Sequence, residues 1–316
     1  MNDIRIIAID MDGTLIGADG HISPRNLTAI NAAHDADIEV VIATGRRHSY
    51  AMKVLRDLDL PSDAVVVSSN GTVTRTIGSE LLHRHLLPLE AAHWLCSHLT
   101  DFRHAFVLTF DKVGANGDDS RGALVVEHFE HLHNSIGRWM EANAPYIEQV
   151  TPIEACLPTH ESATTADTLP IQAMLCGTVE QMRLAEDHLL QSNFVMAEGR
   201  TPPDRALNAT ITIHRTEYPV RDLCIVDILP AGCSKGAALR QLARERNISS
   251  SQIMAIGDNW NDVSMFQEAG TSILMANAPD DLKALASQRG WTVGDLYTND
   301  GAGQAIESIL GTAINR

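Results

Sequence analysis

The stretch IRIIAIDMDGTL at residues 4–15 decides the fold and raises the question of a reaction centre. Its apolar run, which ends at Ile9, is typical of a strand buried on both faces of a parallel sheet. The strand stops at Asp10, and a second carboxylate follows at Asp12, next to a glycine and a threonine. Taken alone, two acids at the end of a buried strand indicate either an ordinary turn or a catalytic carboxylate pair.

The first third of the chain alternates strand and helix outward from this stretch. Ser23 and Pro24 predict a helix start, with serine as the N-cap and proline at the first helical position. The apolar runs EVVIA at 39–43 and AVVVS at 64–68 predict the next two strands. This alternation predicts a parallel sheet with right-handed crossovers.

The middle of the chain has a different pattern, and the alternation returns only near its last third. Residues 86–220 predict strands joined by short loops, with helices between them, which is typical of an antiparallel α+β unit. A polar, proline-broken stretch at 152–168 is expected to be a loop or excursion. The predicted fold class is therefore α/β: a Rossmann-like parallel-sheet core at residues 1–85 and 221–316, with an α+β domain inserted at 86–220.

The composition limits the kinds of partner that the chain can bind. Its 316 residues are enough for two domains, and 44% apolar residues can fill a substantial core. Lysine and arginine total 24 against 40 aspartates and glutamates, which gives a net charge of −16. Such an acidic surface repels nucleic acid and anionic lipid, so we expect neither nucleic acid nor a membrane as a main partner. An anionic substrate then needs a local positive group.

The cysteines and the apolar segments favour a cytoplasmic location. The five cysteines are scattered and form no CxxC pair, so neither a disulfide framework nor a zinc site is indicated. The first residues carry charge before a very short apolar stretch, unlike a secretory signal. No apolar run approaches the ~20 residues that a membrane span needs.

Polar side chains gather at four places, each at the carboxyl end of an expected core strand or at a helix start. In open parallel sheets, ligands bind at the carboxyl ends of the strands, so we expect these side chains to meet despite their separation in sequence. They are Asp10 and Asp12, Thr44, Lys235, and Asp258 with Asn261 and Asp262.

These residue types together suit a phosphoryl group. Two carboxylates 4 Å apart repel by roughly 4 kcal/mol at an effective dielectric of 20, so the cluster requires a cation or a shared proton. Oxygen ligands without histidine or cysteine favour Mg²⁺ over zinc. Lys235 adds positive charge, and the Thr44 hydroxyl with nearby N–H groups can bind an anion. A carboxylate can also accept the phosphoryl group.

Each of these residues alone has an ordinary explanation as a turn, helix-cap or strand-exit residue. Their joint occurrence, in order, is what favours the catalytic interpretation. We expect Trp260 to be a packing or rim residue, and Arg46 and Arg47 to lie at the surface or at the rim of the substrate site. Polar residues in the loop at 111–121 are candidates for substrate specificity.

The four places resemble the ordered motifs of the haloacid dehalogenase-like (HAD) phosphohydrolases, and most closely those of the Cof-type, class IIB branch. The resemblance covers essentially the whole core in two segments, whereas the inserted domain matches only in position and general pattern. The branch usually has glycine where Ala276 stands, and the stretch 152–168 makes the inserted domain longer than usual. The matching stretches are DMDGTL (10–15), TGR (44–46), SSNG (68–71), LPAGCSKGAAL (229–239), GDNWND (257–262), MANA (275–278) and TNDGAG (298–303).

This resemblance implies the roles of the first two places. Asp10 would be the nucleophile that takes the phosphoryl group. Asp12 would be the general acid that protonates the leaving oxygen and then the base that activates water. Thr44 and Gly45 would bind the transferring phosphoryl group.

The resemblance also implies the roles of the later residues. Lys235 would neutralise the oxygens of the nucleophile and the phosphate, and Asn261 would contact the phosphate or a water bound to the metal. Mg²⁺ would be bound by Asp10, by the backbone carbonyl of Asp12 and by Asp258. Asp262 would support the metal site or orient Lys235.

The expected function is hydrolysis of small phosphate monoesters, such as a sugar phosphate or a related metabolite. The resemblance implies a Mg²⁺-dependent phosphatase with an aspartyl-phosphate intermediate and an inserted cap domain of the C2B type. A phosphomutase keeps the same two aspartates and stays open as an alternative. A non-catalytic HAD-fold protein that binds a ligand or a partner is the other alternative.

Overall fold

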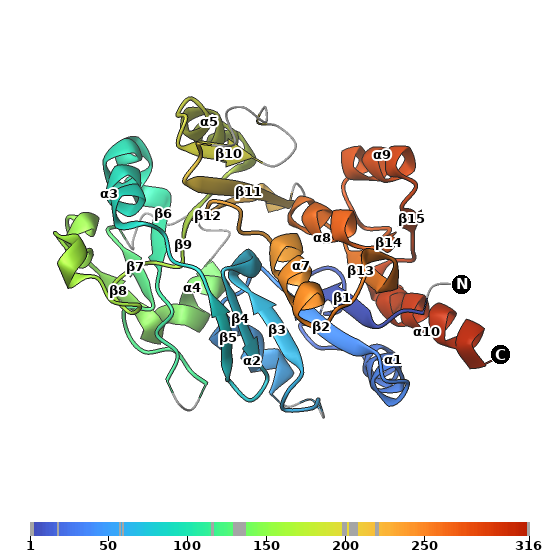
Figure 1. The fold of residues 1–316 in the computed structure, drawn as a ribbon. Coiled ribbons are helices and arrows are strands. Elements are labelled where there is room, and N and C mark those ends of the chain that lie inside the picture. The colour runs from blue at the N-terminus through green and yellow to red at the C-terminus, as the bar shows by residue number, and fades with distance from the viewer. Residues whose placement is uncertain are drawn as a thin grey trace. The chain divides into compact units, whose positions relative to one another are not determined.

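The computed structural model describes residues 3–17, 19–56, 58, 60–114, 117–128, 137–197, 201, 208–218 and 221–314. The chain divides into two compact units. Unit 1 combines Met1–His83 with Ser234–Arg316, and unit 2 is Arg84–Cys233. Each unit has a sheet of its own, and in unit 1 the first and last parts of the chain share that sheet (Figure 1).

Unit 1 contains an eight-stranded sheet in which β1 lies between β2 and β13. The strands from β15 to β3 pair in parallel, and β4 pairs antiparallel with β3. The expected parallel α/β core is therefore confirmed. In spatial order the strands are β15 (Thr292–Val293), β14 (Thr271–Leu274), β13 (Ile253–Gly257), β1 (Ile6–Asp10), β2 (Glu39–Ala43), β3 (Val65–Ser68), β4 (Val73–Thr76) and β5 (Leu81–Arg84).

Helices cover both faces of this sheet, which explains why β1 is apolar throughout. Ile7 and Ile9 pack against α1 (Pro24–Asp35), α2 (His48–Leu55) and α10 (Gly301–Ile314). Ile6 and Ala8 face α7 (Lys235–Glu245), α8 (Val263–Glu268) and α9 (Asp280–Arg289) on the other side. A strand enclosed in this way is a rigid support for the side chains at its end.

The predicted start of the first helix is confirmed. Helix α1 begins at Pro24, and the Ser23 hydroxyl accepts a hydrogen bond from the backbone N–H of Asn26 at 3.1 Å. This bond satisfies one of the N–H groups that a helix start leaves without an intrahelical partner.

Unit 2 contains a seven-stranded mixed sheet with helices, which confirms the expected α+β character of the insertion. Its central pairs, β11 with β12, β12 with β9, and β9 with β6, are antiparallel. Helices α3 (Leu89–His98) and α5 (Val179–Leu190) pack on one face. In spatial order the strands are β10 (Val195–Ala197), β11 (Ile211–Tyr218), β12 (Leu223–Pro230), β9 (Gln172–Gly177), β6 (Phe106–Thr109), β7 (Leu124–Val126) and β8 (Ile147–Gln149).

Helix α4 (Gly137–Asn143) places Trp139 and Met140 against the other face of this sheet. The sequence predicts a helix from residue 134, and residues 134–136 lie outside the described part of the chain. Residues 115 and 116 of the expected specificity loop also lie outside it.

The second boundary between the units differs from the sequence-based one. The sequence places the strand at 223–229 in the core, with a boundary at residue 221. In the structure β12 hydrogen-bonds to β11 and β9, so it belongs to the sheet of unit 2, which extends to Cys233. The pattern of apolar residues identifies the strand correctly, but the partner strands decide its sheet.

The excursion at 152–168 is anchored by a partly buried ion-pair cluster in unit 2. Arg103 lies 2.7 Å from a carboxylate oxygen of Glu127 and 3.0 Å from one of Glu154, at the start of the excursion. Glu127 also accepts a hydrogen bond from the backbone N–H of Ile153 at 3.3 Å. The excursion is therefore tied to the unit 2 sheet at its first residues.

Among the described residues, no helix is both long enough and apolar enough to cross a membrane.

Candidate active site

The parallel sheet of unit 1 brings the expected site residues to one edge. Asp10 is the last residue of β1 and is 5% exposed. Thr44 directly follows β2, and Asp258 directly follows β13. Because these three strands are neighbours and parallel, their carboxyl ends lie side by side. Side chains that are far apart in the sequence thus meet, as expected.

Lys235 is a fully buried cation between two carboxylates. Its Nζ lies 2.5 Å from Oδ1 of Asp10 and 2.7 Å from Oδ1 of Asp262, and its exposure is 0%. Lys235 is the first residue of α7, whose N-cap is Ser234. Burial acts to lower the pKa of Lys235, but the two carboxylates outweigh it and raise that pKa above its ordinary value. The side chain is therefore an ammonium group.

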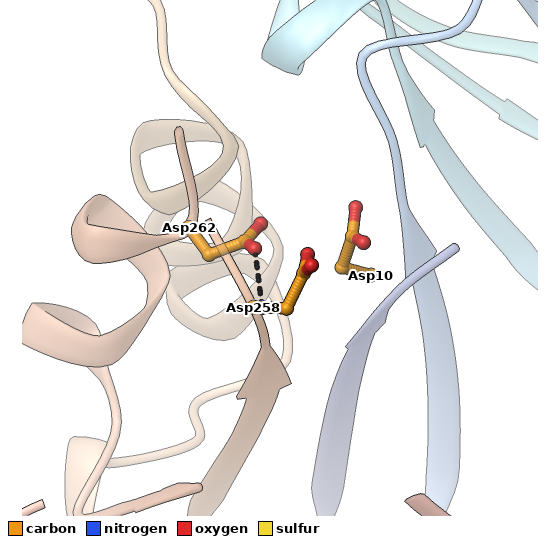
Figure 2. A group of neighbouring side chains, drawn as sticks. All are labelled: Asp10, Asp258 and Asp262. Carbon is orange, nitrogen blue, oxygen red and sulfur yellow. Dashed lines mark hydrogen bonds between the residues drawn. The ribbon is translucent and has the colours of Figure 1, made fainter. Parts of the chain in front are cut away.

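Three carboxyl groups form a cluster suited to a divalent cation. One oxygen from each of Asp10, Asp258 and Asp262 lies within 4.8 Å of the others, and Figure 2 shows the three groups close together. Asp262 already has partners on both oxygens: Lys235 on Oδ1, and the backbone N–H groups of Asp258 and Asn259 on Oδ2. Within the described part of the chain, Asp10 and Asp258 each retain one carboxylate oxygen without a hydrogen bond. Those two oxygens could bind the cation.

Burial and crowding change the acidity of this cluster. Burial, and then the nearby charge of Asp262, raise the pKa of Asp10 to about 7, although Lys235 acts in the opposite direction. Burial, followed by Asp10 and Asp262, also raises the pKa of Asp258 well above its usual range. A bound divalent cation would favour the ionised form of both groups, because it adds two positive charges beside them. The donor set and its electrostatics therefore fit such a cation.

Asp12 makes a two-point ion pair that the sequence did not indicate. Nε of Arg46 donates to Oδ2 of Asp12 at 2.7 Å, and Nη2 donates to Oδ1 at 2.6 Å. The guanidinium also lies over the ring of Tyr50, 5.0 Å from its centre. The sequence predicts Arg46 at the surface or at the rim of the substrate site, and that prediction names no partner for its guanidinium group. Paired donors of this kind fix the orientation of a carboxylate.

The Asn70 side chain lies next to two of the expected phosphate-binding residues, Asn261 and Gly45. The amide Nδ2 of Asn261 donates to Oδ1 of Asn70 at 3.1 Å. A Cβ atom on Gly45 would lie 3.2 Å from Nδ2 of Asn70, so the glycine leaves room for this amide. Thr44 accepts a hydrogen bond at its hydroxyl from the backbone N–H of Arg46 at 3.1 Å. The SSNG stretch contained Asn70, but sequence reasoning gave that residue no role.

Asn277 is a second residue that sequence reasoning missed. Its Nδ2 donates to Oδ2 of Asp258 at 3.0 Å and to the backbone carbonyl of Gly13 at 2.9 Å. Its Oδ1 accepts from the backbone N–H of Tyr297 at 3.2 Å. The amide thus fixes one oxygen of Asp258, and among the described residues the other oxygen has no hydrogen bond. Its place in the MANA stretch was the available signal.

The predictions for Trp260 and Arg47 have different outcomes. Trp260 packs half-buried against the core on the α7 side, as predicted for a packing residue. Arg47 was expected at the surface or rim, but it is 7% exposed and stands at the start of α2. The prediction for Arg47 was wrong, because a position directly before a buried helix is enclosed by that helix and its neighbours.

We expect Gly257→Ala to destabilise the protein by about 2 kcal/mol, because an added methyl group overpacks a filled site. A Cβ atom at this position would lie 2.5 Å from Oδ2 of Asp262, the oxygen that binds the two backbone N–H groups. Urea denaturation measures the change. Gly311→Ala is the matched control: among the described residues the new methyl group would meet no atom within 4 Å outside its own helix backbone, and alanine in helix α10 should be neutral or slightly stabilising. Equal effects of the two substitutions would contradict the crowding at Gly257.

Comparison with known proteins agrees with the geometry. The family model for haloacid dehalogenase-like hydrolases matches residues 7–197 and 206–306. The chain is 26% identical over 285 residues to a Shigella flexneri protein named HMP-PP phosphatase, a match that covers 89% of this chain and 87% of that protein. It is 30% identical over 295 residues to the 5-amino-6-(5-phospho-D-ribitylamino)uracil phosphatase of Bacillus subtilis (strain 168), covering 89% of this chain and 90% of the relative.

Solved structures show the same fold. A haloacid dehalogenase-like hydrolase from B. subtilis matches with a TM-score of 0.70 at 19% identity, covering 96% of this chain and 99% of that one. A HAD subclass IIB sugar phosphatase matches with a TM-score of 0.66 at 19% identity, covering 96% of this chain and 98% of the other. These structural matches confirm the fold class, and the family model confirms the resemblance drawn from the motifs.

Proposed function

Because this chain belongs to the haloacid dehalogenase-like hydrolase family, we propose that it is a phosphatase that hydrolyses phosphate monoesters of small metabolites with the help of Mg²⁺. The observation that carries the proposal is the buried carboxylate of Asp10, paired with Lys235 and adjacent to a free oxygen of Asp258. The names of the two curated relatives, both phosphatases of small phosphorylated compounds, support the same class of substrate.

The first chemical step transfers the phosphoryl group to Asp10. Its carboxylate oxygen forms a bond to phosphorus while the bond from phosphorus to the leaving oxygen breaks. Asp12 gives a proton to that leaving oxygen, and the dephosphorylated alcohol departs. Because Arg46 binds both oxygens of Asp12, this carboxyl group must release at least one of those hydrogen bonds to carry a proton.

The second step releases inorganic phosphate. Asp12, now a carboxylate, takes a proton from a water molecule, whose oxygen attacks phosphorus. The bond between phosphorus and Asp10 breaks, and the carboxylate is restored. Arg46 holds the Asp12 carboxylate in a fixed orientation through two hydrogen bonds.

The proposed phosphate-binding groups reduce the charge repulsion of an anionic substrate. Lys235 neutralises oxygens of Asp10 and the phosphate, while Thr44, Gly45 and Asn261 supply hydrogen-bond donors. Mg²⁺, bound by Asp10, the Asp12 carbonyl and Asp258, would add positive charge where negative charge develops. With Asp262, the three carboxylates of the cluster carry three negative charges, which the ion and Lys235 balance.

We expect the purified protein to hydrolyse p-nitrophenyl phosphate with added Mg²⁺, and to lose that activity when EDTA removes the metal, because the carboxylate cluster then repels the phosphate dianion. Release of p-nitrophenol measures turnover, and restoration by Mg²⁺ is the control for chelator damage. Absence of turnover with Mg²⁺ across the accessible pH range would overturn the proposal. Label transfer from one substrate hydroxyl to another, without release of phosphate, would indicate the phosphomutase alternative instead.

A panel of phosphorylated metabolites identifies the substrate class. We propose sugar phosphates and related metabolites as the first compounds, and kcat/KM ranks them. A substrate whose non-phosphate part also binds to the protein should have a higher kcat/KM than p-nitrophenyl phosphate. Binding energy from the non-reacting part of a substrate contributes to catalysis.

A further inference from the structure

The turn after β3 has an unusual backbone. Three consecutive residues adopt positive φ angles: +48° at Ser69, +52° at Asn70 and +95° at Gly71. Two of them are not glycine, and left-handed backbone is disfavoured for residues with a side chain. All three are buried. Such a conformation persists only where the surrounding structure requires it, and it often occurs at functional sites.

The backbone of this turn is bonded to the loop that follows β2. The N–H of Asn70 donates to the carbonyl of Thr44 at 3.0 Å, and the N–H of Ser69 donates to the carbonyl of Arg46 at 2.8 Å. The turn therefore holds both ends of the Thr44–Arg46 segment. It fixes the segment that carries a proposed phosphate-binding hydroxyl and the partner of Asp12.

The same turn also contacts the start of α7. A Cβ atom on Gly71 would clash with the backbone carbonyl of Ser234, so only glycine permits this approach. Ser234 is the N-cap of the helix that begins with Lys235. The left-handed turn thus lies between the Thr44 loop and the residue that carries the buried ammonium group.

The side chain of Asn70 reaches the third group of site residues. Its Oδ1 accepts one N–H of the Asn261 amide at 3.1 Å, and both side chains are buried. An amide nitrogen has two hydrogens, so this bond leaves the second N–H of Asn261 for another acceptor. A fixed amide presents that N–H in one direction, which a freely rotating amide does not.

We propose that Asn70 is a positioning residue of the phosphoryl-binding site, and this inference rests on the proposed function. Its side chain orients the free N–H of Asn261 toward a phosphoryl oxygen, and its backbone holds the Thr44 loop in place. Asn70 acts through these residues and takes no part in bond making. The strained turn is the structural cost of placing one amide between the Thr44 loop, α7 and Asn261.

The substitution Asn70→Gly tests the contribution of the Asn70 side chain separately from that of its backbone conformation. Glycine adopts the left-handed conformation readily, so the turn and the melting temperature should be preserved. We expect kcat/KM for p-nitrophenyl phosphate to fall about tenfold, and inhibition by inorganic phosphate to weaken by a similar factor, because one oriented donor is lost. Asn247→Gly is the matched control: Asn247 is exposed, has a φ of +56° and follows the far end of α7. It should leave kcat/KM unchanged.

A double-variant cycle with Asn261→Ala tests whether Asn70 acts through Asn261. If it does, Asn70→Gly causes little further loss in the Asn261→Ala background. Losses that multiply in the double variant, or wild-type kcat/KM and phosphate affinity in Asn70→Gly, would overturn the inference. If the wild-type protein turns over no substrate, the proposed function fails, yet calorimetric binding of inorganic phosphate with Mg²⁺ still decides the role of Asn70. Absence of phosphate binding by the wild type would overturn both.

Discussion

Asp10→Asn is expected to reduce turnover of a phosphate monoester by about 10⁴-fold or more, since loss of a catalytic nucleophile removes the whole covalent route. An amide oxygen is a far weaker nucleophile than a carboxylate, while its size and shape are nearly the same. Folding should survive, because Lys235 keeps its ion pair with Asp262 at 2.7 Å. A neutral side chain also removes the burial of a charge and the repulsion from Asp262, which together raise the pKa of Asp10 to about 7.

Single-turnover kinetics and circular dichroism together check this expectation. Asp35→Asn is the control for the same chemical change, because Asp35 is the exposed last residue of α1 and is not one of the site residues. The control should retain wild-type kcat. Substantial turnover by Asp10→Asn, in a preparation free of deamidated protein, would remove Asp10 as the nucleophile and would leave the carboxylate cluster as a binding site only.

Much of unit 1 could be predicted because its signals are local. Each expected core strand has an apolar run, and the acid or hydroxyl that follows it stands at the carboxyl end. A parallel sheet places such ends together, so Asp10, Thr44 and Asp258 could be assigned to one edge before the structure was known. The cation requirement followed from charge alone, since several carboxylates at one edge repel.

The structure was needed where long-range pairing decides the outcome. The run LCIVDILP at 223–230 directly precedes the helix that carries Lys235, so it has the local pattern of a core strand–helix unit. Its antiparallel partners β9 and β11 place it in unit 2, and no local signal specifies them. Arg46 is similar: its partner Asp12 is 34 positions away, and an arginine after a strand is usually a surface residue.

The buried charges around Lys235 predict the second large effect. We expect Lys235→Met to destabilise the metal-free protein by about 3–5 kcal/mol, because removal of one partner leaves buried charges uncompensated. Methionine fills a similar volume, so the loss comes from the charge and not from a cavity. Activity should also be lost, since no other cation contacts Asp10 among the residues that the structure describes.

The pH dependence of this loss distinguishes charge from packing. The pKa of Asp10 in the folded protein is about 7, above the ordinary value of 3.8, and Lys235 acts to lower it. Removal of the lysine raises that pKa further, so the folded variant binds the proton more tightly than its unfolded chain. Its stability is then greatest at low pH and falls as pH rises through the folded pKa. Urea denaturation in EDTA should show a smaller deficit near about pH 5 than near about pH 8, and the deficit should grow until the pH passes the raised pKa of the variant.

The double variant Lys235→Met/Asp262→Asn provides the matched comparison. Asp262 is fully buried and, apart from Lys235, its side chain binds only the backbone N–H groups of Asp258 and Asn259 among the residues that the structure describes. An asparagine can keep its oxygen toward those donors while the negative charge disappears. We therefore expect the double variant to recover part of the stability lost in Lys235→Met. The effects of the two substitutions should not add, because both residues belong to the same buried cluster. A loss that is independent of pH and additive with Asp262→Asn would mean that Lys235 contributes packing rather than charge compensation.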